Sequence, residues 1–109
     1  MKLPPIPASV FSIHGPIAVE IVEDLRDPEP PHERLFGLFD GFARVIKVRA
    51  GMHHTAMWLT LWHERAHADI AEVGIQISTD QEEAIVNAIA AARVAEMLAS
   101  PPVRRAGKP

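Results

Sequence analysis

Residues 53–73 constrain the fold most, because their apolar residues recur with the period of an α-helix. On a helical wheel with His63 at zero, the same side collects Ala56, Leu59, Thr60, Ala66, His67 and Ile70. The opposite side, which can face water, holds Arg65, Asp69 and Glu72. Trp58 and Trp62 flank the apolar stripe, and we expect them to anchor the helix to a sheet. Gly74 is well placed to end the helix.

The sequence before this helix predicts a small sheet. Residues 17–22 alternate apolar and polar positions, with Ile17, Val19 and Ile21 on one face, as in a half-buried strand. Asp40-Gly41 separates apolar runs at residues 35–39 and 44–49, which predicts an antiparallel hairpin whose turn could extend to Ala43. Three prolines within residues 27–31 predict a loop. We therefore expect a three-stranded sheet, antiparallel or mixed.

A second helix is predicted after the first. Thr79 and Glu82 match the capping-box pattern, and the helix should run to about Ala99, before Pro101-Pro102. It is rich in alanine, which would allow close approach to the first helix. The predicted fold class is α+β, a minimal core with a three-stranded sheet packed on two helices. Residues 1–16 should form a proline-rich arm, residues 17–99 the domain and residues 100–109 a flexible tail.

Composition excludes several classes of function. The formal net charge of −3 over 109 residues argues against nucleic acid as the main partner. Without cysteine, the chain has neither disulfides nor thiolate ligands, so any transition-metal site must use histidine and carboxylate groups. Early prolines argue against a signal peptide, and no apolar run has membrane-spanning length. We expect a soluble, cytoplasmic protein without a membrane partner.

The segment His63-Glu64-Arg65-Ala66-His67 is a His-Glu-x-x-His motif. In a helix, residues four apart lie on one face, so His63 and His67 can provide two ligands of a Zn²⁺ ion, with Glu64 next to the position left for water. The alternative is that both histidines are core residues hydrogen-bonded to backbone groups. Their spacing around Glu64 favours the interpretation as metal ligands.

A catalytic zinc site usually has a third protein ligand. Asp69 and Glu72 point away from the two histidines on the same helix, which leaves Glu82 or Glu83 from the next helix. Glu83 is the preferred ligand because Glu82 is expected to cap its helix, although Glu83 could instead be a solvated residue that favours the helix dipole. Asn87 follows Glu83 by four residues and could accept the free N–H of a zinc-bound histidine.

These groups would support hydrolysis. Zinc lowers the pKa of its bound water to about 7 and polarises the scissile carbonyl. Glu64, as the catalytic base, would take the proton of that water and deliver it to the leaving amine. The chain contains no tyrosine, so a histidine, an arginine or the metal would have to stabilise the oxyanion. We expect an extended peptide substrate to pair with the edge of the strand at residues 44–49.

The order of hairpin, His63-Glu64-x-x-His67 helix and Glu83-Ala84-Ile85-Val86-Asn87 helix resembles the small gluzincin metallopeptidases of the ImmA/IrrE type, found in bacteria, phages and mobile elements. The second helix is also similar to the Glu-Ala-Ile-x-Asp segment of thermolysin-like gluzincins, with Asn87 in place of the aspartate. The resemblance covers residues 17–99. It implies a zincin-like fold, Zn²⁺ as cofactor, and hydrolysis of a peptide or protein substrate, often a repressor or other regulator.

A second hypothesis comes from a different class of protein. The chain could be a metal-binding or protein-interaction module that keeps the zincin fold without hydrolysing anything. The chain is also short and lacks a helix before the sheet, so part of a substrate site could be missing. A homodimer or a regulatory protein partner could then complete it.

Overall fold

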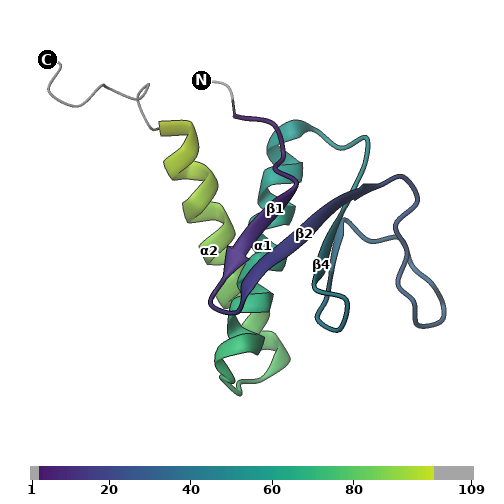
Figure 1. Ribbon diagram of the computed structural model, residues 1–109, viewed down its shortest axis with the longest axis vertical. Helices are drawn as coiled ribbons and strands as arrows, with labels where there is room; N and C mark the ends of the chain where they lie inside the picture. The colour runs from purple at the N-terminus through teal and green to yellow at the C-terminus, as the bar shows by residue number, and fades with distance from the viewer. Residues whose placement is uncertain (1–2, 100–109) are drawn as a thin grey trace, which may run out of the picture.

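The computed structural model describes residues 3–99 as an α+β fold with a four-stranded mixed sheet and two helices (Figure 1). The elements in chain order are β1 (Ser9–Ser12), β2 (Gly15–Val22), β3 (Gly37–Asp40), β4 (Val45–Arg49), α1 (His54–Val73) and α2 (Thr79–Ala99). The predicted α+β class is confirmed, but the sheet has four strands and not three. The tail expected at residues 100–109 lies outside the described residues.

The additional strand, β1, comes from the segment that was predicted to be a proline-rich arm. It pairs antiparallel with β2, with Val10 opposite Ile17 and Ser12 opposite Gly15. Gly15 has a φ of 110°, and such a backbone conformation is accessible mainly to glycine, so the strands can be joined by a tight turn. The strand was missed because it is only four residues long and two of them are serines.

The segment before β1 is held on α1. The carbonyl oxygen of Pro4 accepts hydrogen bonds from Trp58 Nε1 and His54 Nε2, each at 2.7 Å. Leu3 and Ile6 pack against the core. The arm is therefore part of the folded domain.

The sheet order is β1-β2-β4-β3. β3 and β4 form the predicted antiparallel hairpin, and the turn extends beyond Ala43 to Arg44, whose φ is 53°. β4 also pairs in parallel with β2, with Val19 opposite Ile46. Both edges of β4 are thus occupied, so the prediction that a peptide pairs with residues 44–49 is wrong. The unpaired strand edge on this side of the sheet belongs to β3.

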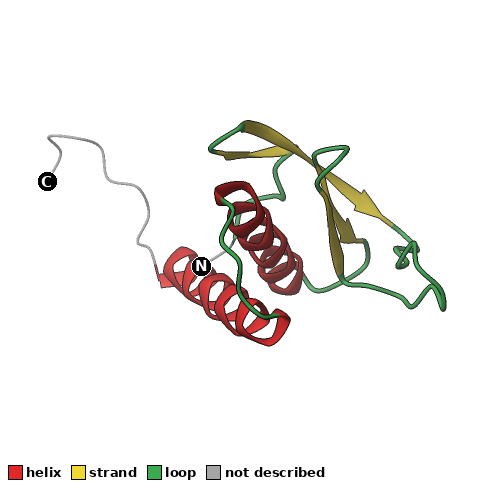
Figure 2. Cartoon of the chain, turned by 90° about the horizontal axis from the view of Figure 1, so that it is seen from below, coloured by secondary structure: helices red, strands yellow, loops and turns green. Residues whose placement is uncertain are grey.

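Helix α1 packs between the sheet and α2 (Figure 2). Trp58, Leu61 and Ala68 are buried in a core whose sheet residues include Val10, Ile17, Ile46 and Val48. Ala66 and Ile70, on another side of α1, are buried against Val86 of α2. Each large apolar side chain buried in this way stabilises the fold by about 1.5–3 kcal/mol. Trp58 is the predicted anchor, whereas Trp62 also reaches α2, where its Nε1 contacts Met97 Sδ at 3.2 Å.

Because α1 is covered on two sides, its polar side is less exposed than the wheel suggested. Arg65, Asp69 and Glu72 are half-buried. The guanidinium of Arg44 binds the Glu72 carboxylate and donates to Ser12 Oγ at 2.9 Å. Hydrogen bonds from Ser12 and Arg44 hold the pKa of Glu72 below its usual value. This cluster connects the β1–β2 turn, the start of β4 and the end of α1.

The end of α1 lies where it was predicted, but the cap at the start of α2 does not. Gly74 ends α1 in the left-handed conformation, as expected, with φ 77°. The cap of α2 is Ser78 and not Thr79: Ser78 Oγ accepts from Gln81 N, and Gln81 Oε1 accepts from Ser78 N, each at 3.1 Å. The capping box therefore starts one residue earlier than predicted. Glu82 takes no part in the box and is available for another role.

Neither helix within residues 3–99 is both long and apolar enough to cross a membrane.

Gly37 allows β3 to lie close to α1. A Cβ atom at this position would be 2.4 Å from Thr60 Cγ2 and 3.1 Å from Glu64 Cγ. We expect Gly37→Ala to lower the free energy of unfolding by about 1–3 kcal/mol, because the strand and helix must separate. Gly41→Ala is the control, since its Cβ would come no closer than 3.4 Å to Phe39. Equal urea-unfolding midpoints for both variants would contradict the close-packing argument.

Candidate metal centre

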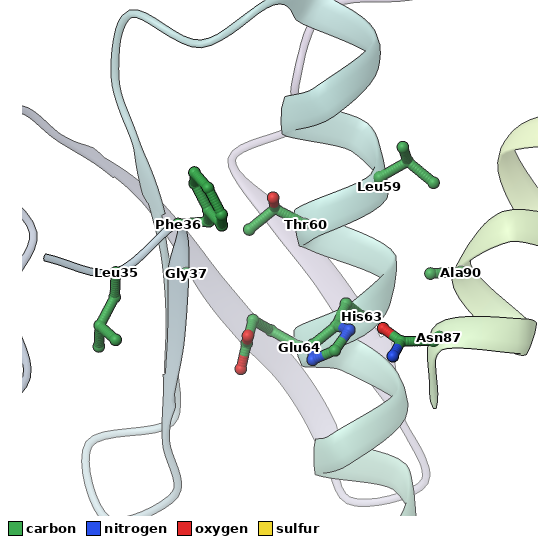
Figure 3. A pocket seen from close by; sticks show the side chains of 9 residues that line it. All are labelled: Leu35, Phe36, Gly37, Leu59, Thr60, His63, Glu64, Asn87 and Ala90. Atoms are coloured by element: carbon green, nitrogen blue, oxygen red, sulfur yellow. The ribbon is translucent and has the colours of Figure 1, made fainter. Parts of the chain in front are cut away.

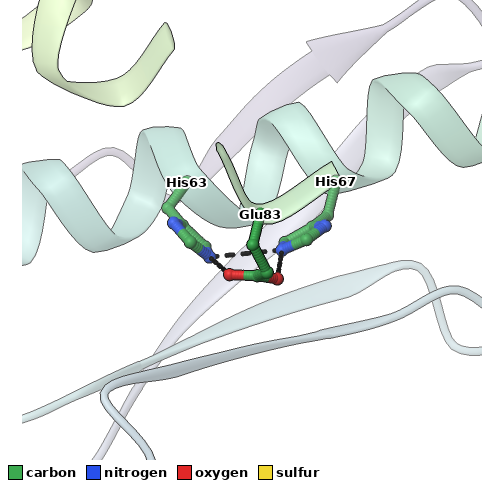
Figure 4. A group of neighbouring side chains, drawn as sticks. All are labelled: His63, His67 and Glu83. Carbon is green, nitrogen blue, oxygen red and sulfur yellow. Dashed lines mark hydrogen bonds and ion pairs between the residues drawn. The ribbon is translucent and has the colours of Figure 1, made fainter. Parts of the chain in front are cut away.

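His63 and His67 extend from successive turns of α1 toward the same point (Figure 4). Their ring centroids are 4.8 Å apart at an interplanar angle of 71°. The two Nε2 atoms face each other at 3.2 Å. The helix thus brings two imidazole nitrogens together, as the four-residue spacing predicted.

Glu83 approaches these nitrogens from α2. Its Oε2 lies 2.8 Å from His67 Nε2 and its Oε1 lies 3.4 Å from His63 Nε2. A tetrahedral zinc ion holds nitrogen and oxygen ligands at about 2.0–2.1 Å, which places neighbouring ligand atoms about 3.3 Å apart. The distance of 3.2 Å between the two nitrogens is close to that value, and Glu83 contacts each nitrogen with a different oxygen. His63, His67 and Glu83 therefore form a group that could hold a metal ion.

Glu82 has a different position. Its Oε2 contacts His67 Nδ1 at 2.5 Å, on the side of the ring away from Glu83. A carboxylate bonded to Nδ1 fixes the orientation of the imidazole and leaves Nε2 free to bind a cation. The geometry therefore favours Glu83 over Glu82 as the third ligand. The expected helix-capping role of Glu82 is taken by Gln81.

Glu64 lies on the side of α1 that faces Gly37 of β3 (Figure 3). Burial raises the pKa of Glu64 from 4.5 to about 7, and the charge of Glu83 adds to the rise. The charge of His67 and a backbone hydrogen bond at Phe39 act in the opposite direction. The side chain is thus suited to exchange a proton near neutral pH.

A cavity of about 420 Å³ opens beside His63 and Glu64. Its apolar lining comes from Leu35, Phe36, Leu59 and Ala90, and its remaining lining residues are Gly37, Thr60 and Asn87. Phe36 is 63% exposed and Leu59 is 37% exposed, so large apolar groups border the opening. Sequence reasoning did not place Leu35, Phe36 and Gly37 near the site, whereas Thr60 was expected on the side of the helix that carries His63. The glycine within the apolar Leu35–Phe39 run was the available signal, since glycine in a strand often marks a close approach.

Asn87 lies in the cavity wall near His63 (Figure 3). Among the described residues, no hydrogen bond joins it to either histidine, and the only carboxylate or amide bonded to a ring Nδ1 of this pair is Glu82. Asp69 and Glu72 were excluded as metal ligands from the sequence, and both have other partners in the structure. Asp69 pairs with Arg65 at 3.7 Å, and Glu72 pairs with Arg44.

Comparison with protein-family models, with curated proteins and with solved structures found no match for this chain.

The raised pKa of Glu64 predicts a pH-dependent stability of the metal-free protein. The pKa of this carboxyl is 4.5 in the unfolded chain and about 7 in the folded chain. Its burial therefore leaves the free energy of unfolding unchanged at low pH and lowers it as the pH rises. In EDTA at pH 8, Glu64→Gln should be more stable than wild type by about 2–3 kcal/mol. At pH 5, urea unfolding should show a difference of less than about 1 kcal/mol. A pH-independent difference would contradict the buried-carboxyl argument.

The two neighbouring glutamates should differ in their effect on metal affinity. Glu83→Ala removes a ligand and should abolish tight zinc binding at neutral pH. Glu82→Ala removes only the group that orients His67, and we expect a loss of about 10–100-fold, measured by competition with a fluorescent chelator. Glu20→Ala, on the exposed part of β2, is the control. A larger loss for Glu82→Ala than for Glu83→Ala would reverse the two roles.

Proposed function

We propose that this chain is a zinc-dependent metalloendopeptidase. The observation that supports the proposal is the convergence of His63, His67 and Glu83, each of which offers one ligand atom within 4.8 Å of the others. Glu64 stands beside this group and borders the same cavity as His63. A group that could hold a cation, a carboxyl that could act as a base and an open cavity thus lie next to one another.

The ligand set suits zinc. Two imidazoles and one carboxylate also suit ferrous iron. The carboxyl of Glu64 beside the ligand group is the feature that favours zinc and hydrolysis, because hydrolysis needs a base for the attacking water. Bound zinc would lower the pKa of a water ligand to about 7 and polarise the scissile carbonyl.

The residues of the chain would do the remaining work. Glu64 accepts the proton of the attacking water on its carboxylate and delivers it to the leaving amine. Glu82 holds His67 through Nδ1, so that the ring does not turn away from the cation. The apolar border of the cavity excludes water from part of the reacting region, which strengthens the electrostatic effect of the ion.

An extended peptide is the substrate that best suits the surroundings. β3 is an edge strand whose pairing with β4 leaves its other edge unpaired, and Gly37 at the start of β3 lines the cavity. A peptide could add to this edge through backbone hydrogen bonds while one apolar side chain enters the cavity lined by Leu35, Phe36 and Leu59. Affinity would come from the backbone and selectivity from the cavity.

The resemblance to the small gluzincins of the ImmA/IrrE type agrees with this proposal. It adds a zincin-like assignment for the fold and a regulatory protein of a phage or mobile element as the class of substrate. The supporting residues are His63-Glu64-x-x-His67 and Glu83, which the fold brings together. The resemblance also makes Asn87 the expected partner of a zinc-bound histidine, and Asn87 lines the same cavity as His63.

One observation favours the second hypothesis, a metal-binding module without hydrolytic activity. Apart from His63, no residue lining the cavity is a histidine, an arginine or a lysine, and the whole chain lacks tyrosine. The donors left for a tetrahedral oxyanion are the cation, backbone groups, the Asn87 amide and the Thr60 hydroxyl. A charged or tyrosine donor would have to come from a partner protein.

Zinc content and cleavage, measured on the same variants, distinguish the two functions. Glu64→Gln should keep one zinc per chain by mass spectrometry of the metal and lose about 10²–10⁴-fold in cleavage of a quenched fluorescent peptide library. His63→Ala should lose both zinc and cleavage. Zinc-loaded wild type without Glu64-dependent cleavage would refute the peptidase and support the module.

A further inference from the structure

A second, much smaller pocket lies between α1 and α2. Its volume is about 20 Å³, and it is lined by Trp62, Arg65, Ala66 and Asp69 of α1 together with Ile89 and Arg93 of α2. None of these residues lines the larger cavity beside His63. The four residues of α1 follow the spacing of one helix face, and so do the two of α2. The pocket is therefore a feature of the helix contact that is separate from the site described above.

Two guanidinium groups lie over the indole ring of Trp62 in this pocket. Cζ of Arg65 is 5.4 Å from the ring centroid, and Cζ of Arg93 is 5.2 Å from it. Because Arg65 belongs to α1 and Arg93 to α2, each helix brings one positive charge to the same ring. A guanidinium that packs on an aromatic ring keeps its N–H donors in its own plane, where they can reach an acceptor.

One of these donors has no acceptor. Nε of Arg65 is buried and forms no hydrogen bond within the part of the chain that the structure describes. The carboxylate of Asp69 lies 3.7 Å from this nitrogen, which is too far for a hydrogen bond. A buried donor without an acceptor is unfavourable. With two arginines and one aspartate, the lining also carries one formal positive charge that nothing in the lining balances.

We infer that this pocket binds inorganic phosphate. A volume of about 20 Å³ holds roughly one water-sized atom, so one phosphate oxygen enters and accepts the hydrogen bond of Arg65 Nε. The other oxygens stay at the mouth of the pocket, where the guanidinium of Arg93 binds them. A tetrahedral oxyanion suits two guanidinium groups from different helices, because its oxygens point in several directions.

Other occupants suit the pocket less well. A single water molecule would satisfy Arg65 Nε, but it would leave the positive charge of the lining unbalanced. A carboxylate has two oxygens in one plane, which match the fork of one guanidinium and not two. Asp69 is the one negative group of the lining, and it competes with phosphate for Arg65.

A phosphate held by Arg65 and Arg93 would bridge α1 and α2. The same contact between these helices brings Glu83 to His63 and His67. Because the two arginines are brought to one ring only in the folded chain, phosphate would bind the folded state and raise its thermal stability.

NMR titration of the full chain with inorganic phosphate at pH 6 tests the site, and it requires neither metal nor catalytic activity. With the ionic strength held constant by sodium chloride, the Nε–H signals of Arg65 and Arg93 should shift with one common Kd on the order of 1 mM. The Nε–H signal of Arg34, which lies outside the pocket and is 54% exposed, is the internal control. Equal shifts at Arg34, or no shift at Arg65, would overturn the inference.

Two variants should change the affinity for phosphate in opposite directions. Arg93→Gln removes one cationic donor and should weaken binding about 10-fold or more. Asp69→Asn removes the competing carboxylate and should tighten binding about 2–5-fold. Asp24→Asn is the matched control, since Asp24 also pairs with arginines but lies outside the pocket. Equal tightening by Asp24→Asn would overturn the site, and so would an unchanged affinity in Arg93→Gln.

A parallel titration with glycerol 3-phosphate distinguishes the free ion from a phosphate ester. The lining offers no further polar group for the organic part of an ester, so the ester should bind no more tightly than inorganic phosphate. Tighter binding of the ester would overturn the assignment to the free ion.

Discussion

The packing of α1 between the sheet and α2 is the constraint on which the rest of the structure depends. One side of the helix buries Trp58, Leu61 and Ala68 against the strands, and another buries Ala66 and Ile70 against α2. The site lies between these two sides, with His63 and His67 directed toward α2 and Glu64 toward β3. The proposed base and the candidate ligands are therefore positioned by separate interfaces of the same helix, while the charges of His67 and Glu83 still act on the pKa of Glu64.

The division of roles between Glu82 and Glu83 follows from the start of α2. Because Ser78 and Gln81 form the capping box, both glutamates are free of the helix end and can reach the histidines. Glu83 bridges the two Nε2 atoms, and Glu82 binds Nδ1 of His67. Adjacent carboxylates on one helix point about 100° apart. They can thus approach the same imidazole from different sides, one as a ligand and the other as an orienting group.

Sequence reasoning was most successful where the controlling contacts are local. The period of residues 53–73, the stop at Gly74 and the hairpin around Asp40-Gly41 depend on neighbours in the chain, and all are present. The cap of α2 was misplaced by one residue because Ser78 with Gln81 and Thr79 with Glu82 fit the same pattern. The edge position of β3, and the central position of β4, follow from the parallel pairing of β2 with β4, a contact between distant segments that local pattern does not encode. The cavity depends on Gly37 approaching α1, which is equally non-local.

All three candidate ligands lie within residues 63–83, a segment of two helices joined by a short turn. Contacts between near neighbours in sequence form faster than those between distant segments. The helical pair could therefore take up a cation early in folding, before the β2–β4 pairing is complete. Glu64 acquires its buried surroundings only when β3 reaches the helix. Closure of the candidate ligand group and burial of Glu64 would then be separate stages of folding.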